Sequence, residues 1–174
     1  MQRIATFEKV SFTQFKLGAE LCDVPLYGDK LLAAYQRIAL PARATAGSAG
    51  YDFYSPFFFT LSTRETITIP TGIRVKIEPG WWLGLLPRSS HGFKFRVQLD
   101  NTMGVIDSDY YNADNEGHIM VKLSNDSLKG KHLRLDEGDG FCQGIFLPYG
   151  ITTNDMAMSE RTGGFGSTDQ GEIF

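Results

Sequence analysis

The stretch IRVKIE, at residues 73–78, decides the fold class of this chain. Its apolar side chains alternate with charged ones, so an extended backbone would place all the apolar ones on one face. Residues 93–100 and 119–124 repeat this period of two, and residues 81–86 form a short apolar run. We therefore predict β-strands over these stretches, each alternating strand with one buried face.

Turn-forming residues separate the predicted strands. Glycine, proline or aspartate occurs at residues 70–72, 79–80, 126–130 and 137–140, and these residue types favour tight turns. Short strands at such spacing are typical of a β-sandwich, a jelly roll or a barrel. The sequence shows neither an internal repeat nor a dividing linker, so we expect one all-β domain.

Residues 1–40 have a different pattern. Apolar residues at helical spacing predict a helix over residues 30–38, with Asp29 as its N-cap. These apolar residues are Leu31, Leu32, Tyr35 and Ile38. Residues 7–15 fit either a strand or a short helix. We therefore expect a small helical N-terminal extension.

The length of 174 residues suits one domain with a sizeable core. We divide it into an extension at 1–40 that packs on the core, a β core at 41–158 and a flexible arm at 159–174. The net charge of −3 gives no general attraction to nucleic acid polymers or anionic membranes. Neither a disulfide framework nor a signal peptide or membrane span is visible, so we expect a cytoplasmic protein.

Four segments place polar residues where a strand end would favour apolar ones: 49–55, 87–92, 104–110 and 140–143. Arg88, Ser89 and Ser90 could cradle an anion or form a plain turn. Asp107 could start a turn or do acid–base chemistry. Gln143 could brace a site or face solvent.

The C-terminal stretch RTGGFGST, at residues 161–168, suits a nucleotide. Its glycines let the backbone approach phosphate, Arg161 neutralises charge, and Phe165 offers a stacking face. The alternative is a disordered tail, which is common for a glycine-rich terminus.

Taken together, the four segments and the tail resemble the five motifs of the homotrimeric dUTP pyrophosphatases (dUTPases), in order and spacing. The resemblance implies a distorted jelly roll of short antiparallel strands and a homotrimer with sites shared between subunits. It implies hydrolysis of dUTP to dUMP and pyrophosphate, which limits uracil in DNA. Mg²⁺ would be the cofactor, bound through the substrate phosphates and water.

The resemblance also implies a role for each matching residue. Asp107 would activate the water that attacks the α-phosphorus, and Tyr110 would pack under the deoxyribose and exclude a 2′-OH. The uracil edge would be read by Asn101 and by the backbone of Gly104, Val105 and Met120, with Ile106 beside them. The phosphates would be held by Arg88, Ser89 and Ser90, with Gln143 and Asp52 behind them, Asp52 through metal-bound water.

The tail would complete this site. Arg161 would reach the γ-phosphate, and Phe165 would lie over the uracil. Three further residues would close on the phosphates: Gly166, Ser167 and Thr168.

Some features depart from the family pattern. Residues 111–116 lengthen the base-binding hairpin, and the tail has one residue fewer between Arg161 and Phe165. Residues 1–40 match nothing in the family. The histidines show no metal-ligand spacing, so we expect them at the surface or in hydrogen bonds: His91, His118 and His132.

Two other functions stay open. The dCTP deaminases share the fold and resemble residues 116–125, but Lys122 stands where their catalytic glutamate is expected, and an ammonium group cannot accept a proton. The other alternative is a regulatory protein that binds a partner in its dUTP-bound state.

Overall fold

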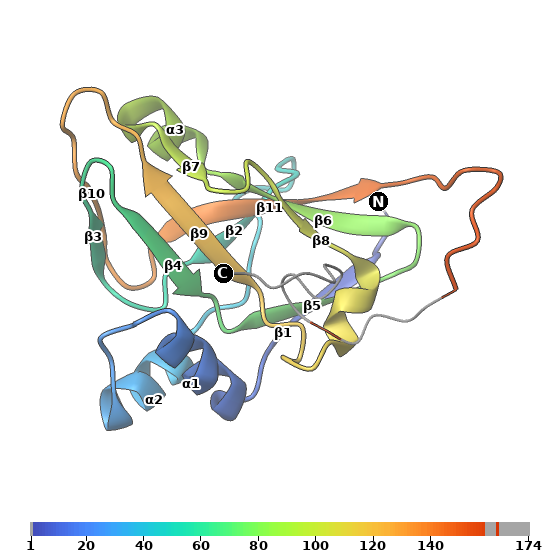
Figure 1. The fold of residues 1–174 in the computed structure, drawn as a ribbon, viewed down its shortest axis with the longest axis horizontal. Helices are drawn as coiled ribbons and strands as arrows, with labels where there is room; N and C mark the ends of the chain where they lie inside the picture. The colour runs from blue at the N-terminus through green and yellow to red at the C-terminus, as the bar shows by residue number, and fades with distance from the viewer. Residues whose placement is uncertain (1, 159–162, 164–174) are drawn as a thin grey trace.

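The computed structural model describes residues 2–158 and 163 (Figure 1). The strands are β1 (Ala5–Lys9), β2 (Tyr51–Tyr54), β3 (Phe59–Leu61), β4 (Thr66–Pro70), β5 (Ile73–Ile77), β6 (Trp81–Pro87), β7 (Val97–Leu99), β8 (Gly104–Ile106), β9 (Met120–Asn125), β10 (Leu133–Leu135) and β11 (Gly140–Pro148). The helices are α1 (Phe12–Leu21), α2 (Gly28–Arg37), α3 (Ser89–Phe95) and the 3₁₀-helix η1 (Ser108–Asn112). Within the described residues, no helix combines the length and hydrophobicity that a membrane crossing requires.

The strands pair antiparallel throughout the described sheets. The largest sheet has the order β2-β11-β6-β8, and a second has the order β4-β9-β7. Strands β1 and β5 form a two-stranded sheet, as do β10 and β3. This arrangement confirms the predicted all-β, jelly-roll-like fold class.

The alternating pattern is confirmed in β5 and β9. The side chains of Ile73, Val75 and Ile77 are buried in β5, and those of Val121 and Leu123 are buried in β9. The residues between them are more exposed, because each strand turns one face to the core and the other away from it. The apolar run at 81–86 is β6, as predicted.

The prediction of a strand over residues 93–100 was wrong in its first half. Helix α3 extends to Phe95, Arg96 takes a left-handed φ of 53°, and only Val97–Leu99 are extended. Strand β7 pairs with the end of β9, where Asn125 lies opposite Val97. Because β9 ends there, its edge offers no pairing partner to the residues before Val97. Phe93, which the alternation placed on a buried face, is 93% exposed.

The N-terminal extension contributes both a strand and helices. Residues 7–15 resolve into the end of β1, which pairs with β5, and the start of α1. Helix α2 confirms the helix predicted at 30–38, but its N-cap is Tyr27, not Asp29. The helix begins earlier than predicted, which leaves Asp29 in the first turn, where a carboxylate still interacts well with the helix dipole.

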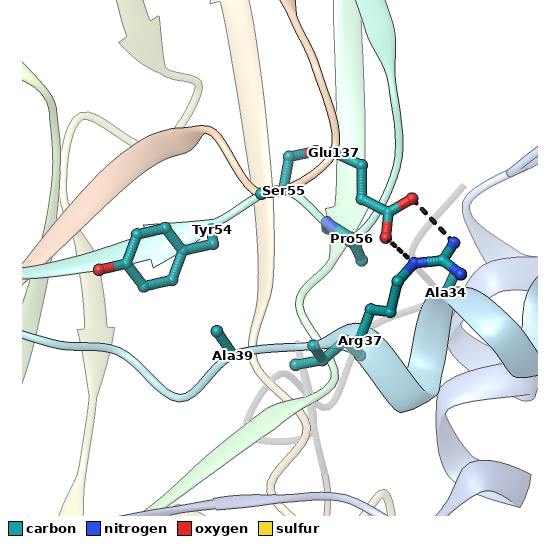
Figure 2. Close-up of a pocket in the computed structure, with 9 residues that line it drawn as sticks. Ala34, Arg37, Ala39, Tyr54, Ser55, Pro56 and Glu137 are labelled. Atoms are coloured by element: carbon teal, nitrogen blue, oxygen red, sulfur yellow. Dashed lines mark hydrogen bonds and ion pairs between the residues drawn. The ribbon is translucent and has the colours of Figure 1, made fainter.

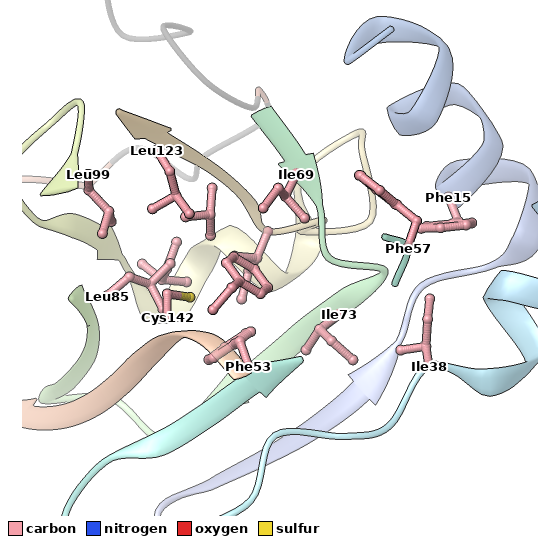
Figure 3. Close-up of a cluster of buried hydrophobic side chains, with 14 of the residues drawn as sticks. Phe15, Ile38, Phe53, Phe57, Ile69, Ile73, Leu85, Leu99, Leu123 and Cys142 are labelled. Carbon is pink, nitrogen blue, oxygen red and sulfur yellow. The ribbon is translucent and has the colours of Figure 1, made fainter. Parts of the chain in front are cut away.

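Helices α1 and α2 lie together beside the sheets (Figure 1), and their apolar residues join the main core. Phe15 of α1 and Ile38 are buried and lie in the same cluster as Ile73 (Figure 3). Gly72, at φ 70°, lies between them, because an added Cβ would approach Ile38 Cδ1 to 2.4 Å. A glycine here therefore lets the extension pack directly on the sheet.

Candidate active site

A pocket of about 310 Å³ opens beside the edge strand β8. Its lining includes the five residues that were predicted to read or lie beside the uracil edge: Asn101, Gly104, Val105, Ile106 and Met120. The remaining lining residues are Thr68, Leu85, Leu99, Asp100, Val121 and Lys122. Residues from β8, β9 and the loop after β7, which are separated in sequence, thus come together around one opening.

Strand β8 is suited to present its backbone to a ligand. It is the edge strand of its sheet and pairs there with β6. An edge strand leaves N–H and C=O groups on its outer side for other partners. Gly104 packs tightly on β6, because an added Cβ would lie 3.1 Å from Leu85 Cβ. A base in the pocket could therefore be read by main-chain groups.

Asp107 directly follows β8 and is exposed. It is the N-cap residue of η1, with an extended backbone at φ −76° and ψ 159°. Tyr110, in η1, is 4% exposed. Its hydroxyl donates to the carbonyl of His118 at 2.9 Å and accepts from Asn115 Nδ2 at 2.8 Å. These two hydrogen bonds fix the ring of Tyr110, whose backbone N–H donates to the carbonyl of Asp107 at 3.3 Å.

A second group of predicted residues surrounds the end of β6. The guanidinium of Arg88 pairs with Asp52, with Nε 3.2 Å from Oδ1, and donates from Nη1 to the Gly140 carbonyl at 3.1 Å. Gln143 donates from Nε2 to the Pro87 carbonyl at 3.1 Å. Gln143 is half-buried, and this hydrogen bond joins its side chain to the end of β6.

The start of α3 completes this second group. Ser89 and Ser90 are exposed in the first turn of α3, directly after Arg88. His91, the next residue of α3, is buried. Burial lowers the pKa of His91, and the charge of Arg88 lowers it further, so this imidazole is neutral at neutral pH. We name Asp52, Arg88, Ser89 and Ser90 the cradle.

Within one chain the cradle and Asp107 lie apart. In the ladder between β6 and β8, Gly104 lies opposite Leu85 and Ile106 lies opposite Leu83. The path from the pocket to Asp107 therefore runs away from Arg88. At about 3.3 Å per residue, the level of Ile106 is roughly 17 Å from Arg88 along the strand.

The predicted tail residues lie outside the described residues: Arg161, Phe165, Gly166, Ser167 and Thr168. Among residues 2–158 and 163, no group of three or more His, Cys, Asp or Glu side chains could hold a metal ion. His118 is buried and accepts a hydrogen bond from Gly72, and His132 is exposed.

A family model described as dUTPase matches residues 36–169. The chain belongs to the dUTPase family. The deoxyuridine 5′-triphosphate nucleotidohydrolase of Lactococcus lactis subsp. lactis is 38% identical to it over 134 residues, which are 75% of this chain and 88% of that protein. The protein of the same name from Chromobacterium violaceum is 37% identical over 151 residues, which are 82% of this chain and 95% of that protein.

Solved dUTPase structures share the fold. The dUTPase from Streptococcus mutans has a TM-score of 0.63 and 32% identity, and the match covers 85% of this chain and 98% of that one. The Staphylococcus bacteriophage 80alpha dUTPase with dUPNHPP has a TM-score of 0.61 and covers 99% of this chain and 97% of that one. Its identity of 17% supports the likeness of fold alone.

Two contacts near the pocket beside β8 were not predicted from the sequence. Lys122 pairs with Asp100 on the pocket wall, with Nζ 3.2 Å from Oδ2. Glu116, in the lengthened hairpin, binds Ser11 of the N-terminal extension. No local signal could reveal the second contact, because its residues are 105 positions apart.

A separate pocket of about 330 Å³ lies at the seam between α2 and the core (Figure 2). Arg37 of α2 and Glu137 form a two-hydrogen-bond ion pair at its edge. Tyr54, Ser55 and Pro56 form the facing wall. This ion pair fastens the extension to the core at a place distinct from the pocket beside β8.

Proposed function

We propose that this dUTPase hydrolyses dUTP to dUMP and pyrophosphate and so limits the incorporation of uracil into DNA. The observation that carries the proposal is the pocket beside β8, whose lining residue Ile106 is followed in the chain by an exposed carboxylate, Asp107. The family membership and the two nucleotidohydrolases at 38% and 37% identity support the same reaction.

The pocket would select the base and the sugar. The backbone of β8, with Asn101, would hydrogen-bond the uracil edge, and a close-fitting pocket would exclude the 5-methyl group of thymine. The buried ring of Tyr110 would lie under the deoxyribose and clash with a 2′-OH. The hydrogen bonds of its hydroxyl to His118 and Asn115 support this role, because a tethered ring cannot move aside.

Asp107 would be the general base. It would accept a proton from a water molecule as the water oxygen forms a bond to the α-phosphorus. The bond from the α-phosphorus to the oxygen that bridges to the β-phosphate would break, and pyrophosphate would leave. Arg88, Ser89 and Ser90 would hold the phosphates in line for this displacement. We propose that Arg161 and the remaining tail residues close over the nucleotide.

We propose Mg²⁺ as the cofactor, held mainly by phosphate oxygens and water. A site of this kind requires few protein ligands, because Mg²⁺ keeps several waters. Asp52, a carboxylate at the cradle, could hold a metal-bound water. When bound, the ion would offset the negative charge of the triphosphate.

The separation within one chain supports a site shared between subunits. A nucleotide with its base at Gly104 and its sugar at Asp107 would extend its phosphates away from the Arg88 of the same chain. The cradle that holds them would then belong to another subunit of a homotrimer. This proposal explains why the two groups of predicted residues lie at different levels of β6.

The ion pair of Lys122 disfavours the deaminase alternative. An ammonium group paired with Asp100 cannot act as a base, and the family match is to the dUTPases. A nucleotide panel with measured pyrophosphate release tests the proposal. We expect magnesium-dependent release from dUTP and poor use of UTP and dTTP. Equal turnover of dUTP and dTTP would disprove it.

Substitution of the proposed general base, Asp107, gives a second test of the proposed function. Asp107→Asn should lower hydrolysis by roughly 10²–10⁴ while dUTP affinity changes much less. Asp136→Asn is the matched control, because Asp136 is an exposed carboxylate in a surface ion pair with Arg134. A normal rate for bound substrate in Asp107→Asn would make Asp107 a binding residue only.

A further inference from the structure

The lengthened hairpin is fastened to the N-terminal extension through Glu116. The backbone N–H of Ser11 donates to Glu116 Oε2 at 2.7 Å, and the hydroxyl of Ser11 donates to Oε1 at 2.6 Å. Both carboxylate oxygens are therefore engaged by one residue. Ser11 is also the N-cap of α1, since its hydroxyl accepts from the N–H of Gln14 at 3.1 Å.

The backbone around Glu116 is held in an uncommon conformation. Glu116 has φ 56° and Gly117 has φ 67°, so two consecutive residues occupy the left-handed region. A non-glycine residue keeps this conformation only where its surroundings stabilise it. Burial raises the pKa of Glu116, but the hydrogen bonds from Ser11, together with the charges of Arg74 and His118, lower it by more, so that the net pKa lies below the usual value. The carboxylate is thus charged at neutral pH, as this contact requires.

A second contact joins the extension to the other end of the insert. The hydroxyl of Tyr111 donates to Glu8 Oε2 at 2.8 Å. Arg74 completes the group, with Nη2 2.9 Å from the same carboxylate oxygen and its guanidinium carbon 4.3 Å from the centre of the Tyr111 ring. Tyr111 is the neighbour of Tyr110, so this contact fixes the backbone next to the proposed sugar-binding ring.

Helix α1 also contacts the segment that follows the lengthened hairpin. Gly18 faces the His118 ring so closely that an added Cβ would lie 2.6 Å from His118 Cε1. At the end of α1, Cys22 Sγ lies 3.9 Å from Met120 Sδ. Met120 lines the pocket beside β8. The extension therefore contacts the chain at 111, 116, 118 and 120, between the proposed sugar contact and the proposed base contact.

We propose that the N-terminal extension positions residues 110–120 for nucleotide recognition, with Glu116 as the positioning residue. The inference rests on the proposed function, because it assigns the selectivity of that same site. Release of Glu116 from Ser11 loosens the backbone that carries Tyr110 and Met120. Selection against a 2′-OH then weakens, because a ring on a loose backbone can move aside.

The test compares Glu116→Ala with Arg37→Gln. Each substitution removes one polar link between the extension and the rest of the chain. Arg37→Gln is the control, because Arg37 pairs with Glu137 at the seam in Figure 2 and not with residues 110–120. For Glu116→Ala we expect the ratio of kcat/KM for dUTP to that for UTP to fall roughly tenfold. We expect KM for dUTP to rise and kcat to stay within about twofold. Arg37→Gln should leave the ratio unchanged.

Two further measurements keep the test decisive. Glu116→Gln retains one acceptor oxygen for Ser11 and should lose less selectivity than Glu116→Ala. In hydrogen-exchange measurements, the amides of residues 110–120 should exchange faster in the Glu116→Gln variant than in the wild-type protein. Exchange in α2 should be the same in both proteins. A folded Glu116→Gln variant allows this readout even if Glu116→Ala does not fold.

The outcomes separate the inference from the function. If the wild-type enzyme hydrolyses dUTP, and both Glu116 variants keep its selectivity and exchange pattern, the extension is structural only and the inference is overturned. If the wild-type protein releases no pyrophosphate from dUTP, the proposed function fails, and the inference fails with it. Lower selectivity in both Glu116 variants, with Arg37→Gln unchanged, supports the inference.

Discussion

The guanidinium of Arg88 is held by the carboxylate of Asp52, 36 positions earlier in the chain, with Nε 3.2 Å from Oδ1. The Gly140 carbonyl accepts a second hydrogen bond from the same guanidinium at 3.1 Å. An added Cβ at Gly140 would lie 2.7 Å from Arg88 Nη1, so the absence of a side chain there makes room for the guanidinium. Arg88 is thus oriented by three strands, β2, β6 and β11, that belong to one sheet.

Asp52→Asn removes the charged partner of Arg88 and keeps the shape of the side chain. We expect kcat/KM for dUTP to fall roughly tenfold, because the guanidinium is no longer held toward the phosphates. Steady-state kinetics with wild-type and mutant enzyme measure this change. Asp136→Asn, which removes the partner of the exposed Arg134, should have no effect. Equal kinetics for Asp52→Asn and the control would show that Arg88 needs no orienting carboxylate.

His118 should make the fold sensitive to acid. Its Nε2 accepts the N–H of Gly72 at 2.9 Å, which requires a neutral ring. Burial lowers the pKa of His118 from 6.5 to about 4, although nearby Glu116 opposes part of this shift. As the pH falls through 6.5, the His118 side chain therefore binds a proton in the unfolded chain, whereas in the folded chain it stays neutral until about pH 4. The contribution of His118 to the free energy of unfolding is fully present above pH 6.5. It decreases as pH falls toward 4, by about 3 kcal/mol in total.

Urea unfolding at fixed protein concentration, between pH 7.5 and 4, measures this loss. His118→Gln keeps a hydrogen-bond acceptor that does not titrate in this range, so the decrease in stability below pH 6.5 should be smaller. His132→Gln is the control, because His132 is exposed. The same pH dependence in both variants and in the wild type would mean that His118 does not contribute.

Gly117→Ala should be much more destabilising than Gly138→Ala. Both glycines have positive φ, 67° and 87°, so each substitution introduces left-handed strain of about 1–2 kcal/mol. At Gly117 the new Cβ would also lie 2.6 Å from the Tyr110 carbonyl oxygen and 2.8 Å from Tyr111 Cα. At Gly138 nothing lies within 4 Å. We expect a loss above about 3 kcal/mol for Gly117→Ala in denaturant unfolding, because backbone cannot move aside cheaply.

Mixed trimers test whether sites are shared. We would refold Asp107→Ala together with Arg88→Ala at equal ratio; each homotrimer alone should be nearly inactive. About three quarters of random trimers are mixed, and each has one site with both residues intact, so about a quarter of wild-type activity should return. Pyrophosphate release measures the recovery, and mass spectrometry verifies the mixing. Activity equal to the sum of the separate mutants would place Asp107 and Arg88 of one site in one subunit.

Much of the fold was readable from local pattern. Apolar and polar residues alternate in β5 and β9 because each strand has one face on the core. The alternation therefore predicts which side chains of these strands are buried. The same alternation in residues 93–95 was misleading, because a strand also needs a partner. Strand β9 ends opposite Val97, so the preceding residues form α3 instead.

The candidate site, too, has features that the local sequence predicted and others that depend on long-range contacts. The motif order pointed to five residues that the structure brings together around the pocket beside β8: Asn101, Gly104, Val105, Ile106 and Met120. The contact between Ser11 and Glu116 was beyond any local pattern, because it joins residues 105 positions apart. Burial of His118 was also missed, since a single histidine in a polar stretch carries no periodic signal.

The sequence by itself determined the antiparallel β class, the order of the motifs and the residue types of the site, because these depend on neighbours within a few positions. Only the tertiary structure decided the register of β6 and β8, which places Arg88 and Asp107 at different levels of one sheet. It also decided that the N-terminal extension lies against the lengthened hairpin at residues 111–116. Register and docking depend on which distant surfaces bury each other, and that is a property of the packed chain as a whole.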